Sequence, residues 1–134
     1  MGESWIRLHA AQRVIPLVVL VAGTAAALAQ ERAPVPNAAA QARAQELFRE
    51  VYGKEYDAAE SSAEKAELAR ILLGQAADIR DDPASHFVLL RIAKNVAVAA
   101  ADAETALEAV DRVIETYDVH PVKTNLDCLG AVAR

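Results

Sequence analysis

The ten residues from Asp81 to Leu90 constrain the fold more than any other part of the sequence. They read Asp-Asp-Pro-Ala-Ser-His-Phe-Val-Leu-Leu. Proline is tolerated in the first turn of a helix because that turn needs no N–H from it, and Asp82, directly before Pro83, is well placed as the N-cap. The segment therefore ends one helix at about Arg80 and begins the next, which predicts a helical hairpin.

Apolar residues recur at helical spacing on both sides of this boundary. Before it, Ser61-Ser62-Ala63-Glu64 matches a capping box and predicts a helix from there to about residue 80. After it, the next helix is apolar around more than half of its circumference, so we expect it to be central and the most buried. Asp102 is expected to cap a fourth helix, which ends at Val119-His120-Pro121.

A first helix is expected from Asn37, a plausible N-cap, and a last one from Thr124. The first carries one apolar stripe, made of Leu47, Phe48, Val51, Tyr52 and Tyr56. The last carries an apolar stripe of Leu126, Leu129 and Val132. A short helix with Gly130 inside it is marginal alone, so we expect this one to dock on the third and fourth helices or to fray.

The composition agrees with a helical protein, since 54% of the residues are hydrophobic but only 4% are aromatic. These patterns predict an all-α fold of antiparallel helical hairpins. We expect four to five helices, forming either a small bundle or a short tetratricopeptide-like array.

The first 29 residues read as a signal peptide. A basic start is followed by an apolar stretch from Val14 to Leu28, and Ala27-Leu28-Ala29 places small residues where a signal peptidase reads. We expect cleavage between Ala29 and Gln30, and an exported protein of the periplasm or cell envelope. The alternative is an uncleaved membrane anchor, although the run is shorter than the about 20 apolar residues that span a bilayer.

The signal peptide at residues 1–29 is expected to be followed by a flexible leader at 30–40, which contains Pro34 and Pro36. A helical domain then covers 41–134, and it could be truncated in its last helix because the apolar pattern still runs there. Cys128 is the single cysteine, so it cannot form an internal disulfide. We expect it to be a buried apolar residue, the alternative being a pairing site for another chain.

No arrangement of residues in the sequence predicts a catalytic site, a metal site or a cofactor. Pro83 interrupts the helix face that would join Asp78 and Asp82 to His86, so His86 is expected to be an ordinary first-turn residue, hydrogen-bonded to Asp82. Asp118 and His120 lack a nucleophile beside them. Cys128, eight residues after His120, lies in a leucine-rich stretch where a thiol is normally inert.

The charges argue against nucleic acid as a partner. The formal net charge is −5, and basic residues are interspersed with acidic ones along every expected helix instead of gathering on one face. Phe48, Tyr52 and Tyr56 could stack on a sugar or a peptide, but such strips at helical spacing more often belong to the core.

These observations predict an exported, non-catalytic helical interaction or scaffold module, whose partner is another protein or a second copy. One alternative is a small periplasmic ligand-binding protein or enzyme, using residues from the set Asp82, His86, His120 and Cys128. Another alternative is a membrane-anchored envelope protein with an uncleaved N-terminal helix, the membrane being a partner only through that segment.

Two resemblances bear on the fold. Ala101-Asp102 and Ala106 are similar to the turn and the small packing residue of a tetratricopeptide repeat, whose Trp-x-x-Leu-Gly-x-x-Tyr half is missing here. From about Ala44 to Leu129 the chain resembles more closely the helical N-terminal module of exported multidomain proteins of planctomycete bacteria. The residues that carry this resemblance are Leu47-Phe48, Tyr56, Lys65, Leu68-Ala69, Leu72-Leu73, Asp81-Asp82-Pro83-Ala84, Phe87-Val88-Leu89-Leu90, Ala101-Asp102, Ala106-Leu107, Val110-Asp111, Tyr117 and Val119. It implies a module that follows a signal peptide and precedes other domains, and it brings no site residues.

Overall fold

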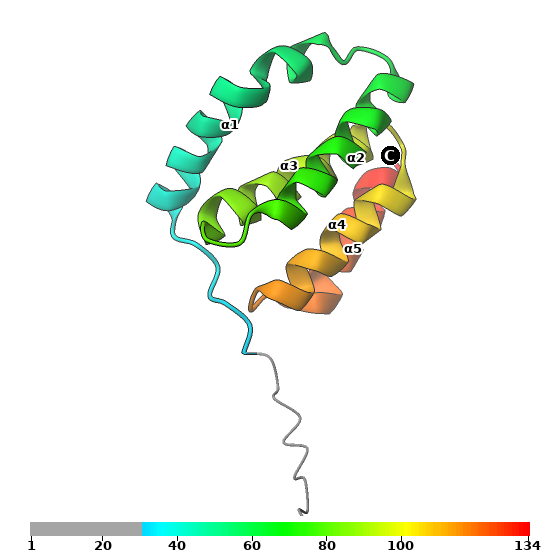
Figure 1. Ribbon diagram of the computed structural model, residues 1–134. Coiled ribbons are helices and arrows are strands. Elements are labelled where there is room, and N and C mark those ends of the chain that lie inside the picture. The colour runs from blue at the N-terminus through cyan, green and yellow to red at the C-terminus, as the bar shows by residue number, and fades with distance from the viewer. Residues whose placement is uncertain (1–30) are drawn as a thin grey trace, which may run out of the picture. The chain divides into compact units, whose positions relative to one another are not determined.

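Five α-helices make up most of residues 31–134, the part of the chain that the computed structural model describes (Figure 1). They are α1 (Ala38–Ala58), α2 (Ser62–Asp78), α3 (Pro83–Ala99), α4 (Ala103–Thr116) and α5 (Pro121–Val132). The predicted all-α fold is confirmed as a small helical bundle. The expected signal peptide and its cleavage site between Ala29 and Gln30 lie outside the described residues.

The boundary between α2 and α3 is built as the sequence predicts. Asp82 is the N-cap of α3, and its carboxylate accepts hydrogen bonds from the N–H groups of Ala84 and Ser85, both at 3.1 Å. Pro83 occupies the first helical position. Hydrogen bonds from the side chain and backbone of Ser85 hold the pKa of Asp82 below its usual value. The cap therefore keeps its charge, which favours a helix N-terminus.

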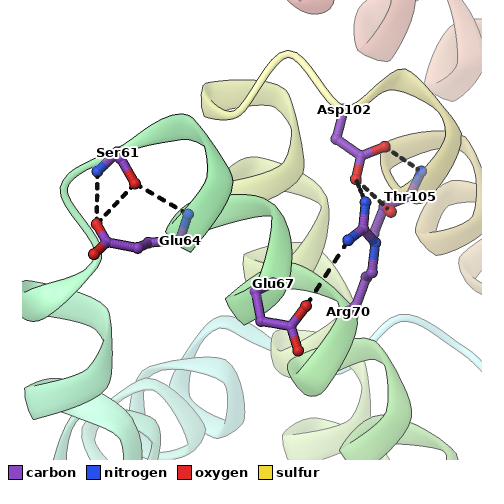
Figure 2. A network of polar contacts seen from close by, with 6 residues as sticks. All are labelled: Ser61, Glu64, Glu67, Arg70, Asp102 and Thr105. Atoms are coloured by element: carbon purple, nitrogen blue, oxygen red, sulfur yellow. Dashed lines mark hydrogen bonds and ion pairs between the residues drawn. The ribbon is translucent and has the colours of Figure 1, made fainter.

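Figure 2 shows the caps of α2 and α4. Ser61 and Glu64 form the predicted capping box, in which Ser61 Oγ accepts from the Glu64 N–H at 3.2 Å and the Glu64 carboxylate accepts from the Ser61 N–H at 2.9 Å. Asp102 caps α4 by accepting from the Thr105 N–H at 3.2 Å. Arg70 of α2 donates to the same Asp102 carboxylate at 3.0 Å, and so ties α2 to the start of α4.

Helix α3 is central, as predicted, because it packs against each of the other four helices. Its contacts with α2 and α4 are the most extensive, whereas α1 rests mainly on α3 and touches α2 little. Leu90, Ala93 and Ala97 are fully buried on α3. The core continues into α2 through Leu72 and into α4 through Val110.

The turn between α3 and α4 is a Schellman motif closed by an alanine. The N–H of Asp102 donates to the Ala97 carbonyl at 2.9 Å, and the N–H of Ala101 donates to the Val98 carbonyl at 3.0 Å. Ala101 has a φ of 55°, a left-handed conformation in which its Cβ lies too close to the backbone. Glycine, which has no Cβ, is the usual residue at this position.

Replacing Ala101 with Gly is therefore expected to raise the free energy of unfolding by about 0.5–1 kcal/mol. Removal of the left-handed penalty of about 1–2 kcal/mol outweighs the entropy that glycine adds to the unfolded chain. Urea denaturation of residues 30–134 measures the change. The matched control is Ala99→Gly at the exposed end of α3, which should lower stability by a similar amount. An A101G variant no more stable than the parent would contradict this reading of the turn.

The residues before α1 contact the end of α4. Asn37 is the N-cap of α1, as predicted, and α1 begins at Ala38, so residues 38–40 of the expected leader are helical. Further back, the N–H of Ala33 donates to the Thr116 carbonyl at 2.8 Å, and its carbonyl accepts from the Asp118 N–H at 2.9 Å. This pairing joins segments about eighty residues apart, so no local pattern reveals it. The flexibility expected of residues 30–40 stays a prediction.

Helix α5 begins earlier than the sequence predicts. Its N-cap is His120 instead of Thr124, and Pro121 takes the first helical position. A proline has the φ that this position needs, so Val119-His120-Pro121 both ends α4 and starts α5. Thr124 lies inside the first turn, where its hydroxyl donates to the His120 carbonyl at 2.9 Å.

The face by which α5 docks also differs from the expected one. Cys128 is the buried residue of α5, with 1% of its surface exposed, and Val132 packs beside the core. Leu126 and Leu129, which were expected to dock on α3 and α4, are 63% and 47% exposed. The prediction of a buried Cys128 is confirmed. The expected docking of this helix on α3 and α4 is found, but Cys128 and Val132 make it, and the two leucines of the stripe stay exposed.

Candidate functional site

The structure does not bring together the four residues considered for an enzyme. The Asp82 carboxylate is used in capping α3, and His86 Nδ1 lies 2.8 Å from Tyr117 Oη instead of on Asp82. His120 caps the start of α5, and Cys128 lies eight residues further along that helix, about 12 Å in rise. Burial raises the pKa of the Cys128 thiol, which disfavours the reactive thiolate. Within residues 31–134, no group of three or more His, Cys, Asp or Glu side chains could hold a metal ion.

His86 and Tyr117 form a polar contact inside the bundle that joins the start of α3 to the end of α4. Tyr117 is 1% exposed, and its hydroxyl donates to the Pro83 carbonyl at 2.8 Å. Because that hydroxyl has a single proton, we assign the Nδ1–H tautomer to His86, which then donates to Tyr117 Oη. The Phe87 ring meets the Tyr117 ring edge-on at 5.0 Å between centroids. Burial raises the pKa of Tyr117 to about 12. The contact is therefore structural.

Burial, and secondarily the positive charge of Arg112, lowers the pKa of His86. Its folded-state pKa thus lies below the unfolded value of about 6.5, and folding favours the neutral ring. The contribution of this ring is fully present above pH 6.5 and is lost as the pH falls towards the folded-state pKa. We expect the free energy of unfolding to fall between pH 7.5 and 5.5, and to fall less in a His86→Gln variant. Urea denaturation at several pH values measures both slopes, and equal slopes would contradict this account.

The strongest candidate for a binding surface is an apolar groove on the side of α1 that faces α2, with α3 as its floor and Ile79, the C-cap of α2, as its residue on the α2 side. In Figure 1, α1 lies apart from α2 over most of its length. The groove has a volume of about 210 Å³. Its lining residues are Ala44, Leu47, Phe48, Val51, Tyr52, Ile79, Ser85, Val88 and Leu89. We call it the α1–α2 groove. It exists because α1 rests on α3 through Ala44 and Phe48, its two buried residues, and leaves the rest of its apolar stripe uncovered.

The rim of the α1–α2 groove carries large exposed apolar side chains. On α1, Leu47 is 48% exposed and Val51 is 56% exposed. On α2, Gln75 accepts a hydrogen bond from the Tyr52 hydroxyl of α1 at 3.5 Å. Residues four apart share a helix face, so Ile71, which is 47% exposed, lies on the same side of α2 but outside the lining of the groove.

The sequence offered a signal for one wall of this groove. Leu47 and Val51 belong to the apolar stripe expected on the first helix, and that stripe is wider than the surface that one neighbouring helix covers. The sequence analysis did not single out Ile71 as an exposed apolar residue near α1. It lies beside the main apolar face of its helix, so no pattern apart from its own hydrophobicity pointed to it.

A second uncovered surface lies on α5. Val122, Leu126 and Leu129 are 62%, 63% and 47% exposed, and their spacing of four and three residues puts them on one face. We call these three residues the α5 stripe. The described residues contain eight exposed large hydrophobic side chains, and five of them line the groove or belong to this stripe. Exposure on this molecule is therefore concentrated in two places.

A wider and more polar groove lies on the other side of α1, towards α3, with a volume of about 480 Å³. Arg49, Tyr56 and Arg91 line it, together with Phe48. The aromatic strip is partly core, since Phe48 is buried and stacks on Tyr52 at 5.6 Å, whereas Tyr56 is 47% exposed.

Comparison of the chain with protein-family models, curated proteins and solved structures found no match. The helix spacing also differs from a tetratricopeptide repeat, since α2 and α4 begin 41 residues apart, at Ser62 and Ala103, and that repeat has about 34 residues. Within residues 31–134, no helix is both long and apolar enough to cross a bilayer. The site therefore rests on the geometry of the bundle.

Proposed function

We propose that this protein is an exported, non-catalytic interaction module that binds an apolar helix in the α1–α2 groove. The observation that carries the proposal is the groove itself, whose lining is apolar and aromatic apart from the hydroxyls of Ser85 and Tyr52, and whose α1 rim carries the exposed apolar side chains of Leu47 and Val51. Large exposed apolar patches on soluble proteins mark interaction sites. Laying an amphipathic helix in such a groove is a common mode of recognition.

The dimensions of the groove favour a helix over a small molecule. Its volume of about 210 Å³ is below the roughly 300–1,000 Å³ typical of small-molecule sites. A helix laid along it would contact α1 and α3, with Ile79 on the remaining side. Completing the burial of the half-exposed Leu47 and Val51 would contribute about 1.5–3 kcal/mol from this side of the interface.

Residues 31–134 form one compact unit with its own apolar core, so we expect residues 30–134 to fold alone. The test is the affinity of this fragment for a labelled designed helix, measured by fluorescence anisotropy. The helix has leucines at positions i, i+4 and i+7 in a Lys/Glu/Ala host, and the control peptide has the same composition in scrambled order.

The fragment is expected to bind the striped helix in preference to the scrambled one. Val51→Glu, which puts a charge on the groove rim, should weaken binding about tenfold or more. The matched control is Ala42→Glu, which puts the same charge on the exposed far side of α1 and should leave binding unchanged. Equal binding by V51E and A42E, or equal binding of the two peptides, would refute the proposed function.

Export is part of the proposal and is tested separately. N-terminal sequencing of the protein recovered from the periplasm of an expression host should begin at Gln30, because Ala27 and Ala29 occupy the positions that the peptidase reads. Recovery of the uncleaved chain in the membrane fraction would favour the anchored envelope protein instead.

A second candidate function is the binding of a small anionic ligand in the polar groove between α1 and α3. Its volume of about 480 Å³ is typical of ligand sites, and its charged lining residues are Arg49, Arg91 and Asp57, of which Arg91 also donates to the Gln41 side chain at 2.8 Å. Guanidinium groups pair well with carboxylates. Isothermal titration with succinate as the probe tests this candidate: binding that Arg49→Ala abolishes supports it, and the absence of heat of binding excludes dicarboxylates.

A further inference from the structure

The chain carries both halves of a helix-in-groove interface. The α1–α2 groove lacks an occupant among the described residues, and the α5 stripe lacks a cover. The stripe cannot fill its own groove, because α5 packs on α4 and α3 and makes no contact with α1 or α2. We propose that the α1–α2 groove of one molecule receives the α5 stripe of a second copy. This inference rests on the proposed function and names its occupant.

The lengths of the two surfaces match. The α5 stripe extends from Val122 to Leu129, seven residue steps or about 10.5 Å along a helix. The α1 wall of the groove extends from Ala44 to Tyr52, eight residue steps or about 12 Å. The stripe also has the spacing by which a helix anchors in an apolar groove. The three exposed residues of α5 can therefore lie along the whole α1 wall.

The charges beside the two surfaces are compatible. Asp78 is exposed at the end of α2, directly before the groove residue Ile79, so it lies at that edge of the groove. Lys123 is exposed at the start of α5, beside Val122. The flank of the stripe also carries Asp127, and the α1 rim offers Lys54 to it. Opposite charges at a rim favour one orientation of docking.

The two surfaces lie on different helices, so their contact joins unlike patches. Such a contact is heterologous, and it builds a ring or an open chain when repeated. A heterologous contact can be tested by complementation. A molecule with a damaged groove keeps its stripe, and a molecule with a damaged stripe keeps its groove, so the two together can form one intact interface.

The experiment is sedimentation velocity of residues 30–134 over a concentration series. The parent is expected to exceed the monomer mass as concentration rises. Val51→Glu and Leu126→Glu should each weaken association about tenfold or more, and an equimolar mixture of the two should form a 1:1 heterodimer. The change in both variants is at an exposed side chain, so circular dichroism should show the parental helix content. Ala42→Glu is the matched control and should associate like the parent.

Three results would overturn the inference. A parent that stays monomeric at every concentration would refute self-association through these surfaces. If that monomer still binds the designed helix, the proposed function would remain supported. Continued self-association of L126E, with loss in V51E, would point to a groove-to-groove dimer instead. Failure of the V51E and L126E mixture to form a heterodimer, although the parent associates, would show that the two surfaces do not meet.

Discussion

Replacing Leu90 with Ala is expected to lower the free energy of unfolding by about 3–5 kcal/mol. Leu90 is fully buried on α3, the helix that contacts all four others. The variant loses the transfer free energy of the removed atoms and leaves a cavity among residues from several helices, which cannot all move to fill it. Urea denaturation followed by circular dichroism gives the difference.

The matched control for this prediction is Leu126→Ala on α5. The same atoms are removed from a side chain that is 63% exposed, so stability should change by less than about 0.5 kcal/mol. A domain of this size has only about 5–15 kcal/mol of stability in total, so the L90A variant should lose a large fraction of it. Similar losses in L90A and L126A would contradict the central position of α3.

The second large effect is expected at Tyr117, where Tyr117→Ala should lower stability by about 3–5 kcal/mol. The ring is fully buried against Phe87, and its hydroxyl is bonded to Pro83 and His86. Tyr117→Phe keeps the ring but leaves the His86 N–H without its partner, so it should cost about 1–3 kcal/mol. Urea denaturation of both variants separates the packing from the hydrogen bonds.

Tyr56→Phe is the control for the hydroxyl, because Tyr56 is 47% exposed and its change should be close to zero. Tyr117 also forms an isolated β-bridge with Ala33 in the segment before α1. The two segments joined by this bridge should separate when the tyrosine is lost. We therefore expect trypsin to cut after Arg32 faster in Y117A than in the parent. Unchanged cleavage in Y117A would show that Tyr117 does not hold the segment around Ala33 in place. A Tyr117→Phe variant as stable as the parent would contradict the contribution assigned to the hydroxyl.

Features encoded by neighbouring residues were predictable from the sequence. Asp82 with Pro83, the Ser61 to Glu64 capping box and Asp102 each act within three or four residues, so their roles follow from local order alone. The central place of α3 followed from the breadth of its apolar surface, because a helix that is apolar on most sides must be covered on most sides.

Features that depend on contacts between distant segments were not predictable. His86 was expected to hydrogen-bond to Asp82, but its hydrogen-bond partner is Tyr117, which lies thirty-one residues away in the sequence. The face of α5 that is buried depends on the space that α3 and α4 leave for its side chains. A small Cys128 fits against them, whereas Leu126 was left outside. A pattern of apolar residues shows that a helix has an apolar face, but it does not show which part of that face is covered.

The candidate site follows from the same limit. The stripe expected on the first helix was real, and the sequence could not show that α3 covers only the part around Ala44 and Phe48. The remainder, with Leu47 and Val51, became the wall of a groove. The uncovered part of an apolar stripe is thus the feature that suggests binding.

The most direct test of the α1–α2 groove as a helix-binding surface is a methyl-detected NMR titration of residues 30–134 with the designed striped helix. The account predicts that the shifted methyl signals are those of Leu47, Val51, Ile79 and Leu89, with Ile71 at the edge. Shifts confined to Val122, Leu126 and Leu129, or no shifts at a helix concentration that saturates binding, would contradict it.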